Sequence, residues 1–370
     1  MLKVKINSLL DYIQPTKYIV SSEEYSNEFN TPVLTAGDTF LLGYTNDKDG
    51  IYNASKHNPI ILFDDFTTAI KWVDFPFKVK SSACKIIVSK TKTNLRYCYY
   101  AMKAMNFDHL QHKRYWISEY SEQLINDYED ENSKIVAELD NITDTISKKE
   151  QVILNLDELI KSRFIEMFET IDLSEERPNW IGLEKLAKIY TGTTPSSSDE
   201  TNWNGDILWI TPAEMKSNSF YIYDTVRKIT EKGRKSKSLE IMPVNTVLLS
   251  TRAPIGKVGI VGKPMTCNQG FKNFWCGPKL NPVFLYTLFK NNVDYLNSLG
   301  SGTTFLEISK SRISKLKVPV PPIELQNKFA AFVEQVDKSK VVCYSKYFLW
   351  LNLTFVSSTI AYSNVVSILE

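Results

Sequence analysis

Apolar side chains recur along the middle of the chain at alternating steps of four and three residues. Lys149 and Arg163 fill the two steps of this heptad pattern that apolar residues leave open. The apolar members are Ile135, Leu139, Ile142, Ile146, Ile153, Leu156, Ile160 and Met167. No Pro or Gly occurs between residues 119 and 169. The pattern predicts one helix over residues 119–169, about 75 Å long at about 1.5 Å per residue.

A helix with such a seam is not stable alone in water, because its apolar stripe needs a partner. A second stretch, KLKVPVPPIELQNKFAAFVEQVDKSK at residues 315–340, has a Pro-rich start, as helix geometry favours, and then the same spacing. Its seam positions are Leu325, Phe329, Phe332 and Val336. We expect this stretch to pack against the central helix of the same chain. A homodimeric coiled coil is the alternative.

The segments on either side of the central helix resemble each other. Residues 58–88 and residues 245–275 both run through an apolar strand, a polar turn, a second strand and a basic-polar strand. Each is followed by an aromatic-rich helix, which starts near Asn94 in the first copy and near Asn281 in the second, an offset of 187 residues. We interpret this as a degenerate internal repeat, in which each copy forms an α+β domain with short strands and a packing helix.

Charge divides the chain in the same way. The formal net charge is +2, but residues 121–170 hold thirteen acidic and five basic side chains. The central segment therefore carries −8 and the remainder +10. A polyanion such as DNA is attracted to the flanks and not to the middle.

Size and composition favour a folded protein of two or three domains. The chain has 370 residues, of which 43% are hydrophobic and 12% aromatic. The start of the chain is too short and too polar to be a secretory signal. Five scattered cysteines form no CxxC pair, so we expect reduced thiols in a cytoplasmic protein. They are Cys84, Cys98, Cys267, Cys276 and Cys343.

Four stretches, in this order, resemble the specificity subunits of type I restriction–modification systems. The first covers residues 12–83 and the second is LDELIKSRFIEMFE at residues 156–169. The third, YTGTTPSSSDETNWNGDILWITPAEM, ends at Met215, and the fourth is VPVPPIELQNKF at residues 318–329. The resemblance covers roughly residues 5–340.

The resemblance implies an α+β fold with two similar target-recognition domains, joined by a long coiled-coil spacer helix against which a distal helix packs antiparallel. It implies double-stranded DNA as partner, with each domain reading half of a split target. Methyltransferase (M) subunits dock on the helices, and a motor-nuclease (R) subunit joins the full complex. The expected boundaries are residues 1–118 for the first domain, 119–170 for the spacer, 171–318 for the second domain, 319–345 for the distal helix and 346–370 for an atypical tail.

A non-catalytic subunit agrees with the motifs. The chain has no Asn-Pro-Pro-aromatic methyltransferase motif and no GxxxxGK[ST] phosphate loop. His109 and His112 lie one helical turn apart without an evident third ligand, and Asp64 and Asp65 lack the Lys partner of a nuclease site. We expect no cofactor and no metal.

Candidate DNA contacts come from polar and basic positions in the flanks. Arg, Asn and Gln pair with base edges, so Arg252, Asn268 and Gln269 are the candidates for base reading, with structural hydrogen bonding as the alternative. Lys78 and Lys80 alternate with apolar neighbours on a strand, which predicts one basic face suited to DNA, with simple solvent exposure as the alternative. The candidates for phosphate or turn contacts are Thr67, Thr68, Lys71, Arg227, Lys228, Lys232, Arg234, Lys235, Lys237, Thr303, Thr304 and Lys310. For residues 227–237, an ordinary solvated loop is the alternative. Trp203 and Trp209, on either side of an expected Asn-Gly turn, are interpreted as packing residues, with stacking on a base as the alternative.

The end of the chain departs from the family pattern. The family continues with a charged heptad helix, but residues 347–369 carry no charged side chain. Eight Ser, Thr and Asn residues interrupt this stretch, so a membrane span is not expected. We interpret the distal helix as truncated. The alternative functions are therefore a coiled-coil interaction protein, or a silent allele that folds without assembling an active complex.

Overall fold

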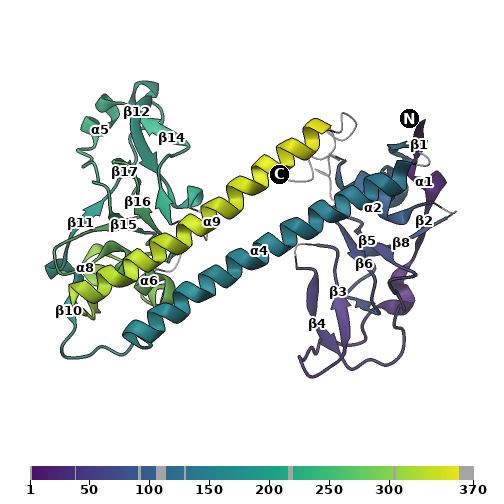
Figure 1. Cartoon of the computed structure of the whole chain (residues 1–370), viewed down its shortest axis with the longest axis horizontal. Coiled ribbons are helices and arrows are strands. Elements are labelled where there is room, and N and C mark those ends of the chain that lie inside the picture. The colour runs from purple at the N-terminus through teal and green to yellow at the C-terminus, as the bar shows by residue number, and fades with distance from the viewer. Residues whose placement is uncertain are drawn as a thin grey trace. The chain divides into compact units, whose positions relative to one another are not determined.

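The computed structural model describes residues 2–37, 39–90, 93–105, 114–128, 131–215, 220–302 and 306–357, with side chains up to residue 340. The chain divides into two compact units. One comprises Met1–Lys149 with Tyr347–Glu370, and the other comprises Glu150–Lys346. We call residues 2–128 the first domain and residues 171–318 the second domain (Figure 1).

The first domain is built on an antiparallel sheet with the strand order β2-β8-β5-β6 and a smaller sheet with the order β4-β3-β7. A third pair joins the first and last strands, β1 and β9. The strands are β1 (Leu2–Lys5), β2 (Leu10–Ile13), β3 (Thr31–Leu34), β4 (Leu41–Thr45), β5 (Ile60–Asp64), β6 (Ile70–Val73), β7 (Lys78–Val79), β8 (Cys84–Ser89) and β9 (Leu124–Asp127). The helices are α1 (Ile6–Leu9), α2 (Leu95–Lys103) and α3 (Tyr115–Ser118), with short 3₁₀ turns at Pro15–Tyr18 and Tyr120–Glu122.

Both faces of the main sheet are buried, which explains the continuous apolar run of β5. Ile61 and Phe63 face a cluster that contains Cys98 and Met102 of α2. Their neighbours Ile60 and Leu62 face a second cluster, which includes residues of the smaller sheet. Alternate side chains of a strand point to opposite faces, so a strand covered on both sides is apolar at every position.

The second domain has a main sheet with the order β11-β18-β15-β16-β13 and a smaller sheet with the order β14-β12-β17. Its first and last strands, β10 and β19, also pair. The strands are β10 (Ile181–Gly182), β11 (Ala187–Thr191), β12 (Trp203–Ile210), β13 (Tyr221–Ile222), β14 (Arg227–Ile229), β15 (Thr246–Leu249), β16 (Val258–Val261), β17 (Met265–Cys267), β18 (Lys272–Cys276) and β19 (Lys317–Val318). The helices are α5 (Glu231–Ser236), α6 (Pro282–Asn291), α7 (Val293–Ser298) and α8 (Lys310–Ser314), with 3₁₀ turns at Leu183–Lys185, Glu200–Asn202 and Pro212–Glu214.

The two domains share one strand topology, as the internal repeat predicts. In each main sheet the first four strands have equivalent places, and β13 is an addition in the second domain. Each smaller sheet combines one antiparallel and one parallel pair around its central strand. The helices α2 and α6 begin alike, because the side chains of Asn94 and Asn281 accept hydrogen bonds from backbone N–H groups of the first turn. The repeat therefore extends from strand order to helix capping.

The long helix α4 (Asn132–Phe168) begins later than residue 119, so the predicted start was wrong. Residues 124–127 instead form β9, which pairs with β1, and Ile125 is buried in the first domain. The side chain of Asn132 accepts a hydrogen bond from the Tyr128 N–H and donates one to Asp127. The first domain accordingly extends past the expected boundary at residue 118, and α4 is about 55 Å long.

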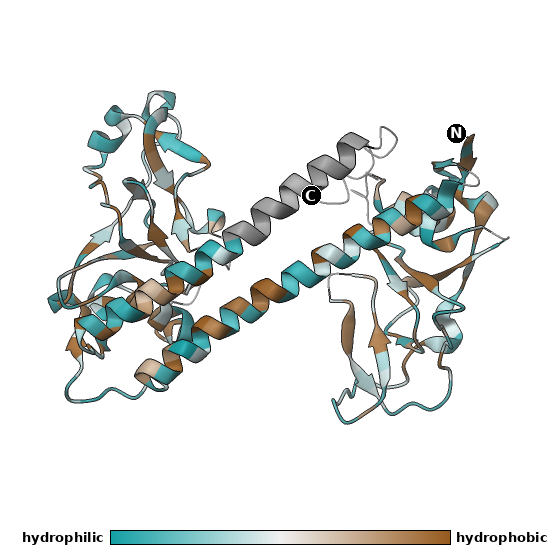
Figure 2. Ribbon diagram, in the orientation of Figure 1, coloured by the Kyte–Doolittle hydropathy of each residue, from teal (hydrophilic) through white to brown (hydrophobic). Residues whose placement is uncertain are grey.

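The heptad seam is the least exposed stripe of α4. All ten seam positions, including Lys149 and Arg163, are half-buried, whereas most other positions of the helix are exposed. Figure 2 shows apolar residues recurring among polar ones along this helix. The most buried residue of α4 is Phe164, which lies next to the predicted seam and has only 1% of its surface exposed.

The end of α4 packs against α9 (Ile323–Ser357) within the second compact unit. The ring of Phe164 lies 5.3 Å from that of Phe329 and 5.5 Å from that of Phe284 in α6. Further along, Lys340 binds Asp157 at 2.6 Å. Contacts therefore move backwards along α4 as they move forwards along α9, so the two segments are antiparallel.

The predicted seam of α9 is only part of its buried face. Phe329 and Val336 are buried, and Leu325 and Phe332 are half-buried. Gln326, Ala330 and Val333 are also buried. The face is wider than a heptad seam because α9 packs on the second domain as well as on α4. The helix also runs past the expected end at residue 345, and no described helix has the length and apolarity needed to cross a membrane.

We expect Phe164→Ala to destabilise the second unit by about 3–5 kcal/mol, because it opens a cavity among the rings of Phe168, Phe284 and Phe329. The neighbouring Ile165, which is 41% exposed, provides the matched control, and Ile165→Ala should cost less than about 1 kcal/mol. Urea unfolding followed by tryptophan fluorescence measures both. Equal effects of the two substitutions would contradict the packing described here.

Candidate nucleic-acid interface

The basic stretch at residues 227–237 forms strand β14 and the short helix α5, and is not an open loop. The side chain of Thr230 caps α5 by accepting a hydrogen bond from the Gly233 N–H. A Cβ atom at Gly233 would collide with the backbone of Asn202, so glycine is required there. Arg227, Lys232, Lys235 and Lys237 are exposed, and Lys228 and Arg234 are half-buried.

Several of these bases have acidic neighbours. Arg234 binds Glu231 at 2.6 Å, and this hydrogen bond is the main reason that the pKa of Glu231 falls to about 2. Lys232 binds Asp199 at 3.2 Å, and Lys228 lies 3.4 Å from Asp224. These pairs are at the surface and contribute little to stability, so the cations remain able to exchange partners. The stretch is therefore less positive than its sequence suggests.

Trp203 and Trp209 are packing residues, as the sequence indicates. Their rings meet edge to face at 5.1 Å, and both are largely buried. Their indole N–H groups donate to the backbone oxygens of Ser196 and Thr193. The guanidinium of Arg227 lies 3.5 Å from the centre of the Trp203 ring. The pair thus holds an exposed arginine in a fixed place.

The expected Asn-Gly turn between these tryptophans is wrong. Asn204 and Gly205 lie inside β12, where the register with β14 shifts between Trp203 and Ile207. Asn204 adopts a left-handed φ of 60°, and a Cβ atom at Gly205 would lie 2.6 Å from the Ile229 oxygen. The dipeptide therefore forms an irregularity within one strand, because the strands continue on both sides of it.

Arg252 follows β15 and is held by an acidic partner. Its Nε atom lies 2.8 Å from one oxygen of Glu307, whose other oxygen lies 3.3 Å from Nζ of Lys272. Burial alone would raise the pKa of Glu307, but the hydrogen bonds from Arg252 and Lys272 lower it below its usual value. Since 43% of the Arg252 side chain is exposed, it is both positioned and accessible.

Asn268 and Gln269 take part in internal hydrogen bonds. Oδ1 of Asn268 accepts from the Gly270 N–H at 2.9 Å. Oε1 of Gln269 accepts from the Thr194 hydroxyl at 2.7 Å. Both side chains are half-buried. These contacts agree with the structural alternative for the two residues, while base reading by either of them remains a proposal.

In the first domain, the turn after β5 presents Thr67 and Thr68. Asp64 stabilises this turn by accepting hydrogen bonds from the N–H groups of Phe66 and Thr67. Thr68 has a left-handed φ of 59°, and Lys71 follows on β6, half-buried. This turn is the first domain's counterpart of the segment that carries Arg252.

The predicted basic face at Lys78 and Lys80 is not formed. Lys80 is exposed, but Lys78 is 4% exposed and its Nζ atom binds Asp47 at 2.8 Å and the Asp49 oxygen at 2.8 Å. The strand β7 is covered on both faces, so both of its side chains are buried. Lys78 is therefore a structural cation.

The remaining candidate residues are the two carboxylates Asp64 and Asp65, the histidines and the polar residues near α8. Asp65 is buried and lies 3.4 Å from Lys85, so neither it nor the turn-stabilising Asp64 points to a nuclease site. Among the described residues, no group of three or more His, Cys, Asp or Glu side chains could hold a metal ion. Lys310 is exposed at the start of α8. His109, His112, Thr303 and Thr304 lie outside the described residues.

Sequence reasoning missed a pair of buried lysines. Lys85 on β8 and Lys272 on β18 are 1% and 7% exposed, and each is paired with a carboxylate. They are 187 residues apart, the same offset as the two helix caps. Aligning the repeat copies would have found them. Equivalent buried cations at the same sheet position indicate a shared structural requirement of the two domains.

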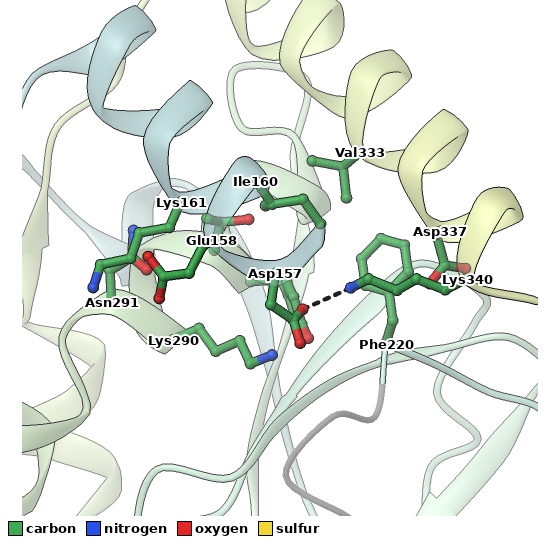
Figure 3. Close-up of a pocket in the computed structure, with 12 residues that line it drawn as sticks. Asp157, Glu158, Ile160, Lys161, Phe220, Lys290, Asn291, Val333, Asp337 and Lys340 are labelled. Carbon is green, nitrogen blue, oxygen red and sulfur yellow. Dashed lines mark hydrogen bonds and ion pairs between the residues drawn. The ribbon is translucent and has the colours of Figure 1, made fainter. Parts of the chain in front are cut away.

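A cavity of about 270 Å³ lies where α4, α6 and α9 meet in the second unit (Figure 3). Asp157, Lys290, Asp337 and Lys340 line it, and the bond between Asp157 and Lys340 crosses one side. Burial raises the pKa of Asp337 and lowers that of Lys290. The two carboxylates and the two ammonium groups balance each other in charge. We therefore interpret the cavity as part of the packing between the helices and not as a ligand site.

Comparison with known proteins places the chain in a family. Residues 181–341 match the model of the type I restriction modification DNA specificity domain. The specificity subunit of the Escherichia coli type I restriction enzyme EcoR124I/EcoR124II is 33% identical over 348 residues, which cover 90% of this chain and 85% of that protein. The MjaIX specificity subunit of Methanocaldococcus jannaschii is 35% identical over 184 residues, 48% of this chain and 43% of the relative.

A solved structure has the same fold. The type I restriction–modification S subunit from M. genitalium superimposes with a TM-score of 0.59 at 16% identity, covering 98% of this chain and 95% of that one. Such proteins form a class of non-catalytic DNA-recognition components. Within that class, this chain belongs to the specificity subunits of type I restriction–modification systems.

The pair formed by Lys78 and Asp47 predicts a pH dependence. The hydrogen bond from Lys78, followed by those from Ser21, lowers the pKa of Asp47 below its usual 3.8. The ion pair therefore stabilises the folded state above pH 3.8, and this stabilisation is lost as the pH falls below that value and Asp47 becomes protonated. Lys78→Met should cost about 2 kcal/mol at pH 6, and the difference from the wild type should shrink below pH 3.8.

Urea unfolding at a series of pH values measures this difference, and Lys80→Met provides the control. Lys80 is 45% exposed and lies 3.5 Å from Glu23, so its loss should change little at any pH. A pH-independent effect of Lys78→Met would show that the ion pair is not its cause.

Proposed function

We propose that the chain reads a split target in double-stranded DNA, with one half-site for each domain. The observation that carries this proposal is the duplication of one strand topology on either side of a long helix. Two similar reading domains joined by a helix are suited to two half-sites separated by a fixed gap. The positive charge of the flanks, with the negative charge on the helix, supports DNA contact at the domains.

In this proposal the base contacts come from the segments that follow β5 in the first domain and β15 in the second. Arg252 is accessible and oriented by Glu307, so it is suited to pair with a guanine edge. The turn at Thr67 and Thr68 has the corresponding place in the first domain. The exposed cations of α5 and Lys310 of α8 contact phosphates, which position the domain without reading sequence.

Methylation mapping tests the proposal. The chain is co-expressed with a methyltransferase subunit of its system, and adenine methylation is mapped with and without the chain. We expect one motif made of two half-sites with a fixed gap. A silent specificity allele or a coiled-coil interaction protein, the alternatives favoured by the uncharged tail, would leave the pattern unchanged. Absence of duplex binding by the complex at low salt would exclude the recognition function.

The basic surface of α5 gives a quantitative prediction. Lys235→Gln with Lys237→Gln should weaken binding to all duplexes about equally, and the slope of log affinity against log salt should fall by about 0.9 for each lysine–phosphate pair that the substitutions remove. The matched control is Lys185→Gln with Lys315→Gln, which removes two exposed cations near the β10–β19 pair. Equal slopes for the two double variants, measured by fluorescence anisotropy, would rule out phosphate binding at α5.

We further propose that α4 carries a docking surface for a methyltransferase subunit. Leu154 and Ile165 are 58% and 41% exposed. They are eleven residues apart, which is about three helical turns, so they lie on the same side of the helix. This side faces away from the heptad seam, so neither the seam nor the second domain uses it. Exposed apolar side chains that recur on one helix face favour an interface with another protein.

Leu154→Glu should therefore reduce co-purification of the methyltransferase subunit by at least about tenfold, because it places a charge in an apolar contact. The control is Asn155→Glu, which introduces the same charge about 100° further around the helix. Size-exclusion chromatography of the mixed subunits measures the result. Unchanged assembly of Leu154→Glu would place the docking surface elsewhere.

A further inference from the structure

Arg96 on helix α2 lies among three aromatic rings. Its Cζ atom is 4.6 Å from the ring centre of Trp72, 5.0 Å from that of Tyr100 and 5.3 Å from that of Tyr99. Trp72 and Tyr99 also contact each other edge to face. A planar guanidinium held among rings loses most of its freedom, so its N–H groups point in fixed directions.

The same guanidinium joins the first domain to α4. Its Nε atom lies 2.8 Å from Oδ1 of Asp140, and Nη2 donates to the Tyr100 hydroxyl at 3.1 Å. That hydroxyl in turn donates to Oδ1 of Asp140 at 2.5 Å and lies 3.3 Å from the Thr143 hydroxyl. Arg96, Tyr100 and Asp140 therefore form a closed hydrogen-bonded triangle, and Asp140 and Thr143 share one face of α4.

The two domains are joined to their helices by different kinds of contact. In the second domain, Phe164 of α4 and Phe329 of α9 are part of the hydrophobic core. Among the residues that the structure describes, neither apolar cluster of the first domain includes a residue of α4. The orientation of the first domain on its helix thus depends on directional polar contacts. Such contacts fix angles more sharply than apolar packing does, but they have fewer atoms to resist rotation.

We propose that Arg96 and Asp140 are positioning residues that hold the first domain at one angle on α4 and thereby restrict the gap between the two half-sites. The inference rests on the proposed recognition of a split target. Neither residue needs to touch DNA, since the effect is transmitted through the orientation of the domain. The triangle controls the specificity for gap length and not the specificity for bases.

A spectroscopic experiment on the full chain tests the positioning role without DNA. Nitroxide labels on p-acetylphenylalanine replace the exposed Lys56 and Ser147, both in the first compact unit. We expect a narrow distance distribution in the wild type and a broader one in Arg96→Met and Asp140→Asn. Asp144→Asn is the control, since it removes an exposed carboxylate of α4 whose described ion pair is with Lys148 one turn away. Unchanged distributions in both triangle variants would overturn the proposal.

A second experiment measures gap specificity. The complex with the methyltransferase subunit is given duplexes whose gap is the wild-type length, one base pair shorter or one longer. The wild type and Asp144→Asn should methylate only the first. Arg96→Met and Asp140→Asn should methylate all three within about tenfold of one another, with unchanged half-site sequences. Arg96→Lys retains the charge without the planar stacking, so it should be intermediate.

The two experiments separate the possible failures. A general loss of methylation in proportion to lost stability, with the gap preference retained, would show a merely structural role and refute the positioning role. Absence of methylation by the wild-type complex on every duplex would refute the proposed function. In that case the label distances still decide whether the triangle fixes the orientation of the first domain.

Discussion

The aromatic contact at the end of α4 is the interaction on which the second unit depends. Phe164 and Phe168 of α4 meet Phe284 of α6 and Phe329 of α9 in one cluster. A long helix with a half-exposed seam gains little stability by itself. Burying its last turns in a globular core anchors it, and the antiparallel α9 extends the buried surface. The end of α4, the first part of α9 and the second domain therefore form one compact unit, Glu150–Lys346, and are not separate modules.

The first domain follows the same strand plan with a different attachment. Its main sheet is buried on both faces, and its first and last strands pair. Its polar contacts with α4 include those of Asn132 at the start of the helix and the triangle of Arg96, Tyr100 and Asp140. A duplicated fold has thus kept its internal packing, while the two copies have acquired unlike junctions. Internal packing is constrained by every strand, whereas a junction is constrained by only a few side chains.

The heptad spacing predicted the central helix, its half-buried stripe and the helix α9 that packs on its C-terminal part, since periodicity reports directly on one face of a helix. The helix start was missed because residues 124–127 satisfy their backbone by pairing with β1, a strand far away in sequence. Lys78 was taken for a surface residue because alternation cannot reveal that a carboxylate such as Asp47 covers it. The engagement of Arg252 by Glu307 depends on a contact across 55 residues, which no local pattern encodes.

The pairing of β1 with β9 and of β10 with β19 has a consequence for how such chains diversify. In each domain the first and last strands are neighbours, so the chain enters and leaves the domain at nearly the same place, as at the two ends of an inserted loop. The coding sequence between the two strands of a pair can therefore be replaced by another whose first and last strands also pair. Such a replacement leaves the length and the heptad register of the helices unchanged. Genetic recombination at these borders would exchange one whole domain for another.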